Sequence, residues 1–268
     1  MPTRISASSY LNTAPLVWSF LYGREHGKVE MILDNAPARS AELLARGRVD
    51  AALVPVFAYQ SIDDVYLVPD VCVGAIDRVR SVCLVTKGEE LTEVRSVALD
   101  NSSRTSVALT KIIFREFLGF EPELRPSEPD INAMLAASDC ALLIGDPALR
   151  LSQTDHRVSD LAGLWNRFTG LGFVFAMWMS RTDVSPVDFA VVRNEGLAHV
   201  DEIIGNYMPE IDLTRNDMRE YLTENIRYGV DEKMRDGMEL YFELARKHQL
   251  INEVKPLRFC RSSPAKQP

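Results

Sequence analysis

The chain has 268 residues, enough to bury a substantial core or to form two modest domains. With 46% hydrophobic and 25% charged residues it has the composition of a folded soluble protein, and its net charge of −8 argues against nucleic acid or an anionic membrane as a partner. No apolar run reaches the length of a membrane span. Residues 1–20 lack the basic start and apolar core of a signal peptide, so we expect a cytoplasmic protein.

The first part of the chain alternates strands and helices. A helix is expected to start near Pro15, capped by Asn12 or Thr13, and a second helix is expected over 37–46. The strands are expected at 4–7, 29–33, 51–54, 65–76 and 81–86. This alternation predicts a mostly parallel sheet flanked by helices.

The middle of the chain, from about 92 to 169, repeats the pattern as a second α/β unit. Its elements are expected at 96–99 (strand), 105–118 (helix), 123–124 (strand), 130–137 (helix) and 140–144 (strand). An apolar strand follows at 173–179. From Ser185 onward the sequence predicts helices, one capped by Ser185 ahead of Pro186, one starting at Thr214 with Asp217, and one over 231–247.

Two α/β units followed by helices predict two lobes with a cleft between them. We expect the apolar strands 81–86 and 173–179 to be the crossings between the lobes. Lobe 1 would then comprise residues 1–80 and 179–268, and lobe 2 residues 81–178. Such a molecule closes around a ligand bound in the cleft. The alternative is a single doubly wound domain.

The segment between strand 96–99 and the following helix has the features of an anion site. It places the hydroxyls of Ser102, Ser103 and Thr105 and the guanidinium of Arg104 at a helix start. The first N–H groups of a helix lack internal partners and attract anions, and an arginine fork suits a carboxylate or phosphate. The alternative is an ordinary helix cap, with Arg104 in a surface ion pair.

Two further junctions resemble this one. Residues 8–15 follow strand 4–7, and Gly145, Asp146 and Pro147 follow strand 140–144. In open α/β sheets, ligands bind beyond the carboxyl ends of the strands, where such junctions meet. Three helix starts facing one cleft would suit a ligand with more than one carboxylate.

The sequence offers no pattern for a metal or a nucleotide. The four cysteines form no CxxC pair and the four histidines have no metal-ligand spacing. P-loop, GxGxxG and GxSxG motifs are missing. We therefore expect neither a metal nor another cofactor. Cys72, Cys83 and Cys140 lie in apolar runs and are expected to be reduced core residues.

Several of these segments resemble the chorismate dehydratase family, which opens the futalosine route to menaquinone. They are SYLNTAPL at 9–16, VDAALVPV at 49–56, SSRTS at 102–106, LIGDPA at 143–148 and LGFVFAMW at 171–178. The resemblance implies an α/β, two-lobed fold like that of type II periplasmic binding proteins, with mixed or parallel sheets and a helical C-terminus, used for catalysis in the cytoplasm. The sister enzyme dihydroxynaphthoate synthase shares that fold but begins with a proline- and cysteine-bearing motif that this chain lacks.

The resemblance also implies a reaction and its residues. The expected reaction removes water from chorismate, a small dicarboxylate, to give 3-[(1-carboxyvinyl)oxy]benzoate. Asn12 and Ser81 are the expected catalytic residues, each donating a hydrogen bond to the departing hydroxyl or to a carboxylate, and Arg80 would add a cation to the cleft. The expected substrate-binding residues are Tyr10, Pro55, Ser102, Ser103, Arg104, Thr105, Gly145 and Asp146.

The sequence leaves alternatives open. Asn12 could be a helix cap, and Ser81 an edge-strand hydroxyl. Asp146 could be the general base or a helix cap, and the substrate's own enolpyruvyl carboxylate, which we favour, could take the proton instead. A non-catalytic small-carboxylate binding protein and the sister synthase are the competing functions. The chain could act as a monomer or a homodimer.

Overall fold

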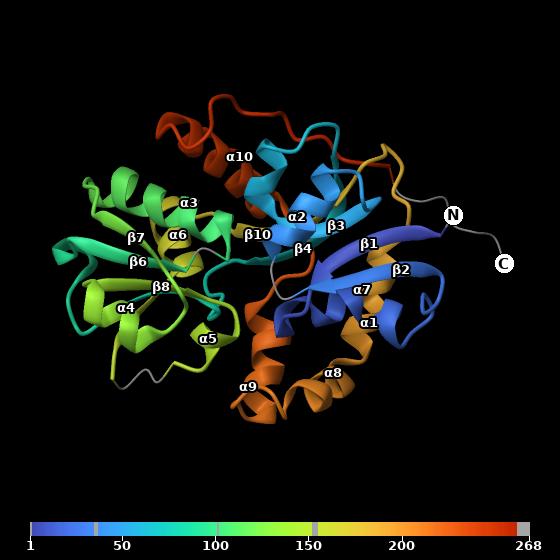
Figure 1. Ribbon diagram of the computed structural model, residues 1–268, viewed down its shortest axis with the longest axis horizontal. Helices are drawn as coiled ribbons and strands as arrows, with labels where there is room; N and C mark the ends of the chain where they lie inside the picture. Colours follow the sequence, from blue (N-terminus) through green and yellow to red (C-terminus); the bar gives the residue numbers. More distant parts are fainter. Residues whose placement is uncertain (1, 35–36, 101, 152–154, 262–268) are drawn as a thin grey trace.

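The computed structural model describes residues 2–34, 37–100, 102–151 and 155–261. The chain forms two lobes, each built on a five-stranded sheet with helices packed against it. In Figure 1 the lobe with β1 and β2 lies to the right and the lobe with β6, β7 and β8 to the left. Within the described residues, no helix is both long and apolar enough to cross a membrane.

The first sheet has the strand order β2-β1-β3-β10-β4. Its strands are β1 (Thr3–Ser8), β2 (Val29–Asp34), β3 (Ala51–Pro55), β4 (Tyr66–Ala75) and β10 (Phe173–Ser180). β1 pairs in parallel with β2 and β3, whereas β10 runs antiparallel to both β3 and β4. The central strand β3 is buried at every position, which agrees with its continuous apolar sequence.

The second sheet has the order β7-β6-β8-β5-β9. Its strands are β5 (Val82–Thr86), β6 (Ser96–Asp100), β7 (Glu123–Ser127), β8 (Cys140–Ile144) and β9 (Arg157–Asp160). β5 runs antiparallel to its neighbours β8 and β9, and β6 is parallel to β7 and β8. The short edge strand β9 was not expected, because Val158 is its only apolar residue. Both sheets are therefore mixed, which confirms the expected two-lobed fold with mixed or parallel sheets, although the alternation of strands and helices alone predicted a mostly parallel sheet.

Helices and helical turns connect the strands and form most of the chain after β10. The α-helices are α1 (Ala14–Leu21), α2 (Pro37–Ala45), α3 (Arg104–Ile112), α4 (Ile131–Ala137), α5 (Asp146–Leu149), α6 (Leu161–Thr169), α7 (Phe189–Ala198), α8 (Val200–Tyr207), α9 (Arg215–Glu220) and α10 (Glu232–Lys247). The shorter turns are the 3₁₀ segments η1 (Leu11–Thr13), η2 (Val56–Gln60) and η3 (Leu91–Glu93) and the π segments η4 (Ile113–Leu118) and η5 (Tyr221–Asn225).

Of the two helix caps predicted for the C-terminal part, the structure confirms one and contradicts the other. The Thr214 hydroxyl accepts a hydrogen bond from the Asp217 N–H at 3.1 Å, which confirms the cap of α9. The expected cap at Ser185 is wrong. α7 starts only at Phe189, where the Asp188 carboxylate accepts the Val191 N–H, and the Ser185 hydroxyl donates to the Val187 carbonyl instead.

The strands β5 and β10 do not cross between the lobes as expected. β5 pairs only within the second sheet, and β10 lies between β3 and β4 in the first. Residues 173–178, assigned to lobe 2 from the sequence, therefore belong to the first sheet. A continuous apolar run indicates a strand buried on both faces, but it does not say which sheet the strand joins.

The C-terminal helix α10 contacts both lobes. In the first lobe, Gly237 packs so closely on β10 and the residues before it that an added Cβ would lie 2.0 Å from the Gly172 carbonyl oxygen. Toward the second lobe, the Tyr241 hydroxyl donates to the Thr105 carbonyl at 3.0 Å. Figure 1 shows α10 beside β10 and between the two lobes, so this helix fastens the lobes together along one side.

Candidate active site between the lobes

A pocket of about 70 Å³ lies between the lobes and is lined by residues of both. It brings together most of the predicted site residues, which come from widely separated segments. Those that line it are Tyr10, Asn12, Pro55, Ser81, Ser103 and Gly145. Ser8, Ser106 and Phe175 also line it and were not predicted. Ser106 could have been found, because it follows Ser103 by one helical turn.

Asn12 and Ser81 each turn an unpaired oxygen toward the pocket region. Asn12 Oδ1 and Ser81 Oγ are both buried and neither has a hydrogen-bond partner among the described residues. Leaving a buried polar atom unpaired costs about 1–3 kcal/mol. Asn12 lies inside η1 rather than at the cap of α1, so it is free of the structural role that the sequence left open. Both oxygens are available to a ligand.

Tyr221 is the third polar residue of this group and was missed from the sequence. Burial raises the pKa of its phenol far above the ordinary value, while the nearby side chains of Ser81 and Asn12 act to lower it. Tyr221 is fully buried at the start of η5, in the C-terminal helical part. No motif marks it, because only the tertiary fold brings η5 to the pocket.

Gly145 is held within the second lobe by Ser81 and contacts Tyr10 of the first lobe at the pocket. Its N–H donates to the Ser81 carbonyl at 2.7 Å, and its φ of 65° lies in the left-handed region that favours glycine. A Cβ at this position would lie 3.6 Å from the ring of Tyr10, so the ring packs directly on the glycine. Burial, followed by the charges of Asp100 and Asp146, raises the pKa of Tyr10.

Asp146 stands at the first position of α5, with Gly145 at the cap, so the expected role as helix cap is wrong. Asp146 is half-buried, and it does not line the interlobe pocket. Burial raises the pKa of Asp146, opposed by the charge of Arg150 and a hydrogen bond from the Leu11 backbone N–H. The carboxylate therefore faces the chain beside Asn12 rather than the pocket itself.

The residues of the predicted anion site at 102–105 do not lie together in the structure. Ser103 caps α3 by accepting the Ser106 N–H at 3.3 Å, and it lines the pocket. Ser102 borders a neighbouring hollow of about 630 Å³ and donates to Asp100 Oδ1 at 2.6 Å. Thr105 is fully buried, and its hydroxyl oxygen accepts the Phe57 N–H. Asn101, from the same turn, lies outside the described residues.

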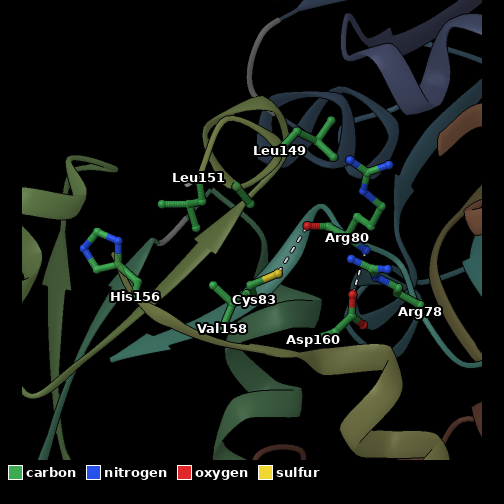
Figure 2. Close-up of a pocket in the computed structure, with 9 residues that line it drawn as sticks. Arg78, Arg80, Cys83, Leu149, Leu151, His156, Val158 and Asp160 are labelled. Atoms are coloured by element: carbon green, nitrogen blue, oxygen red, sulfur yellow. Dashed lines mark hydrogen bonds between the residues drawn. The ribbon is translucent and has the colours of Figure 1, made fainter. Parts of the chain in front are cut away.

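The two arginines expected at the cleft do not line this pocket. Arg104 is exposed and borders a separate hollow, which α3 lines together with Phe57 and Leu250. Arg80 turns into another cavity of the second lobe, shown in Figure 2. Among the described residues that line the interlobe pocket there is no lysine or arginine. An anion there would be held by hydroxyls, an amide and the free N–H groups at the start of α3.

Two lobes with mixed sheets, and a pocket between them that sets a few polar side chains into a mostly apolar lining, define a protein of the periplasmic-binding-protein-like class. Solved structures with this fold include the aliphatic sulphonate binding protein of Escherichia coli (TM-score 0.65, 13% identity, covering 100% of this chain and 96% of that one). A Candida albicans protein described as exhibiting the generic periplasmic binding protein fold has a TM-score of 0.61 at 10% identity over the whole of both chains. A protein of Archaeoglobus fulgidus has a TM-score of 0.68 at 16% identity, over 92% of this chain and 98% of that one.

Sequence comparison is more specific. The model of a family described as menaquinone biosynthesis matches residues 3–247. The chorismate dehydratase of Thermus thermophilus is 33% identical over 265 residues, covering 90% of this chain and 94% of that protein. The chain belongs to this menaquinone biosynthesis family.

Proposed function

We propose that this protein is a chorismate dehydratase, a carbon–oxygen lyase that converts chorismate into 3-[(1-carboxyvinyl)oxy]benzoate and water. The observation that carries the proposal is the 33% identity to the Thermus thermophilus chorismate dehydratase over 90% of the chain. The interlobe pocket supports it by presenting neutral hydrogen-bond donors, among them the Ser81 and Ser103 hydroxyls and the Asn12 amide.

The chemistry asks little more of the protein than orientation and hydrogen bonding. The proton is lost from the ring carbon that bears the enolpyruvyl ether, where conjugation to the ring carboxylate makes it acidic. The neighbouring carbon loses its hydroxyl group. The proton and the hydroxyl together leave as water, and the ring becomes aromatic. Because aromatisation supplies the driving force, the enzyme mainly has to position the substrate and stabilise developing charge.

Asn12 and Ser81 are placed for this task. Their buried oxygens have no partner of ordinary geometry among the described residues, so Asn12 Oδ1 can accept from the substrate hydroxyl and the Ser81 hydroxyl can donate to the substrate. The Asn12 amide and the Ser81 hydroxyl can each donate to the departing hydroxyl or to a carboxylate. Ser103 and the start of α3 would bind one carboxylate of the substrate, because the free N–H groups of a helix start attract anions.

We assign the role of base to the substrate's enolpyruvyl carboxylate. Asp146 does not line the pocket, and its carboxylate accepts the Leu11 N–H. No histidine is found among the described residues lining the pocket. The enolpyruvyl carboxylate is tethered next to the proton to be removed, and such proximity can replace a positioned protein base.

Substrate entry requires the lobes to move apart. The pocket of about 70 Å³ is far smaller than the about 300–1,000 Å³ typical of ligand sites. The Tyr10 ring packs on Gly145 at the pocket, and the Phe57 N–H donates to the Thr105 hydroxyl elsewhere between the lobes; both contacts would separate on opening. We place the reaction in the cytoplasm, where the four buried free cysteines would stay reduced.

The test is direct. The purified protein is mixed with chorismate, without metal or nucleotide, and the ring protons are followed by NMR. New aromatic signals with the vinyl pair retained are expected. Intact chorismate together with ligand-induced thermal stabilisation would show a non-catalytic binding protein instead, and no response of either kind would exclude chorismate as the ligand.

A further inference from the structure

A second cavity, of about 410 Å³, lies within the second lobe and is shown in Figure 2. Arg80 lines this cavity, while the next residue, Ser81, lines the interlobe pocket. The two spaces thus lie on opposite sides of one stretch of backbone. Apart from Arg80, which was expected at the cleft, none of the residues expected to bind or convert chorismate lines the second cavity.

One end of the cavity is positively charged. Figure 2 shows the side chains of Arg78 and Arg80 at the same end. The nearest carboxylate to the Arg80 guanidinium is that of Glu220, at 3.9 Å, which is beyond hydrogen-bonding distance. The side chain of Arg80 is only 16% exposed, so its charge is held largely out of water, and among the described residues this long contact with Glu220 is its only ion pair.

The turn that carries these arginines is held in place by Asp160. Its carboxylate accepts the N–H groups of Val79 at 3.0 Å and of Arg80 at 2.6 Å, and also that of Gly163, at 3.0 Å, at the start of α6. Arg80 has a φ of 62°, in the left-handed region. Such a backbone costs a non-glycine residue about 1–3 kcal/mol and persists only where the surroundings enforce it. The hydrogen bonds to Asp160 hold the Arg80 backbone in this conformation. They also occupy much of the hydrogen-bonding capacity of the Asp160 carboxylate.

Most of the cavity surface is polar, and a smaller apolar floor lies beside the arginines. Cys83, Ala148 and Val158 line it, and the Cys83 thiol donates to the Arg80 carbonyl at 3.2 Å. Burial raises the pKa of that thiol far above its usual range, so Cys83 acts here as a small apolar group. The volume of about 410 Å³ falls within the about 300–1,000 Å³ of small-molecule sites.

We propose that this cavity binds a small organic anion. A carboxylate or phosphate would be held by Arg78 and Arg80, and its apolar body would lie over Cys83 and Val158. Arginine pairs suit oxyanions because each guanidinium presents a planar fork of donors. The proposal is independent of the dehydratase reaction, since it concerns a separate site and is tested by binding alone.

The experiment is calorimetric titration of the full chain with phenyl phosphate, benzoate and inorganic phosphate. We expect phenyl phosphate or benzoate to bind more tightly than inorganic phosphate, because only these two cover the apolar floor. Whichever of phenyl phosphate and benzoate binds more tightly shows whether the site prefers a phosphate or a carboxylate. Arg78→Gln, at an exposed position, is expected to weaken that binding about tenfold or more by removing one charged fork.

The controls separate this site from others. Arg95→Gln removes an exposed arginine elsewhere in the same lobe and should leave binding unchanged. Asn12→Ala alters the interlobe pocket and should also have no effect. Equal affinity in the wild type and Arg78→Gln, loss of binding in Asn12→Ala, equal affinity for inorganic phosphate and the ring compounds, or no binding at millimolar concentration would each overturn the proposal.

Discussion

The hydroxyl oxygen of Thr105, at the start of α3 in one lobe, accepts a hydrogen bond from the Phe57 N–H of η2 in the other lobe at 3.1 Å. The Thr105 carbonyl in turn accepts the Tyr241 hydroxyl of α10. Thr105 was expected to bind substrate, yet here its polar groups join the two lobes to one another and to the C-terminal helix. The closed arrangement is thus stabilised by bonds within the protein as well as by any ligand.

Thr105→Val tests this connection. Valine preserves the shape but leaves the Phe57 N–H without an acceptor, which should lower the free energy of unfolding by about 1–3 kcal/mol. It should also raise KM several-fold, because the closed form that holds substrate loses an interlobe bond. Chemical denaturation and steady-state kinetics measure both effects. Thr105→Ser keeps the hydroxyl and should behave like the wild type, and an unchanged KM in the valine variant would argue against a role in closure.

Ser81→Ala and Asn12→Ala should separate activity from stability. Each is expected to lower kcat about 10²–10³-fold, the usual cost of losing one donor to developing charge. The loss of stability should be small, since among the described residues Ser81 Oγ and Asn12 Oδ1 make no hydrogen bond of ordinary geometry and only the Tyr221 phenol is influenced by their side chains. Ser6→Ala is the matched control. The buried Ser6 hydroxyl bonds that of Ser40 at 2.9 Å, so this variant should lose stability and keep turnover.

The sequence predicts the parts of the site that depend on local structure. Ser103 and Gly145 were found because caps and glycine turns are marked by short-range patterns. The sheet that β10 joins and the approach of Tyr221 to Asn12 depend on contacts distant in sequence, so no local pattern reports them. The direction of Arg104 was also beyond prediction, because a charge at a helix start can face a cleft or solvent equally well.

Gly145→Ala should show how far the interlobe contact depends on backbone conformation. A Cβ would lie 3.6 Å from Tyr10, an ordinary contact, so the strain comes from the φ of 65° rather than from a clash. We expect a loss of about 1–3 kcal/mol in the free energy of unfolding. Gly205→Ala in α8 has open space around it and should instead stabilise by about 0.5–1 kcal/mol. Similar losses in both variants would contradict this distinction.

Asp146→Asn tests whether the protein supplies the base. Burial raises the pKa of this carboxyl above its ordinary 3.8, so the native state holds the proton more tightly than the unfolded state does. The resulting stability is present at low pH and is lost as pH rises through the native pKa. The Asp146→Asn variant should therefore be more stable than the wild type at pH 7. Its free energy of unfolding should also depend less on pH above 3.8. If the substrate's carboxylate takes the proton, chorismate turnover should persist, and a folded variant that binds chorismate without converting it would instead make Asp146 the base.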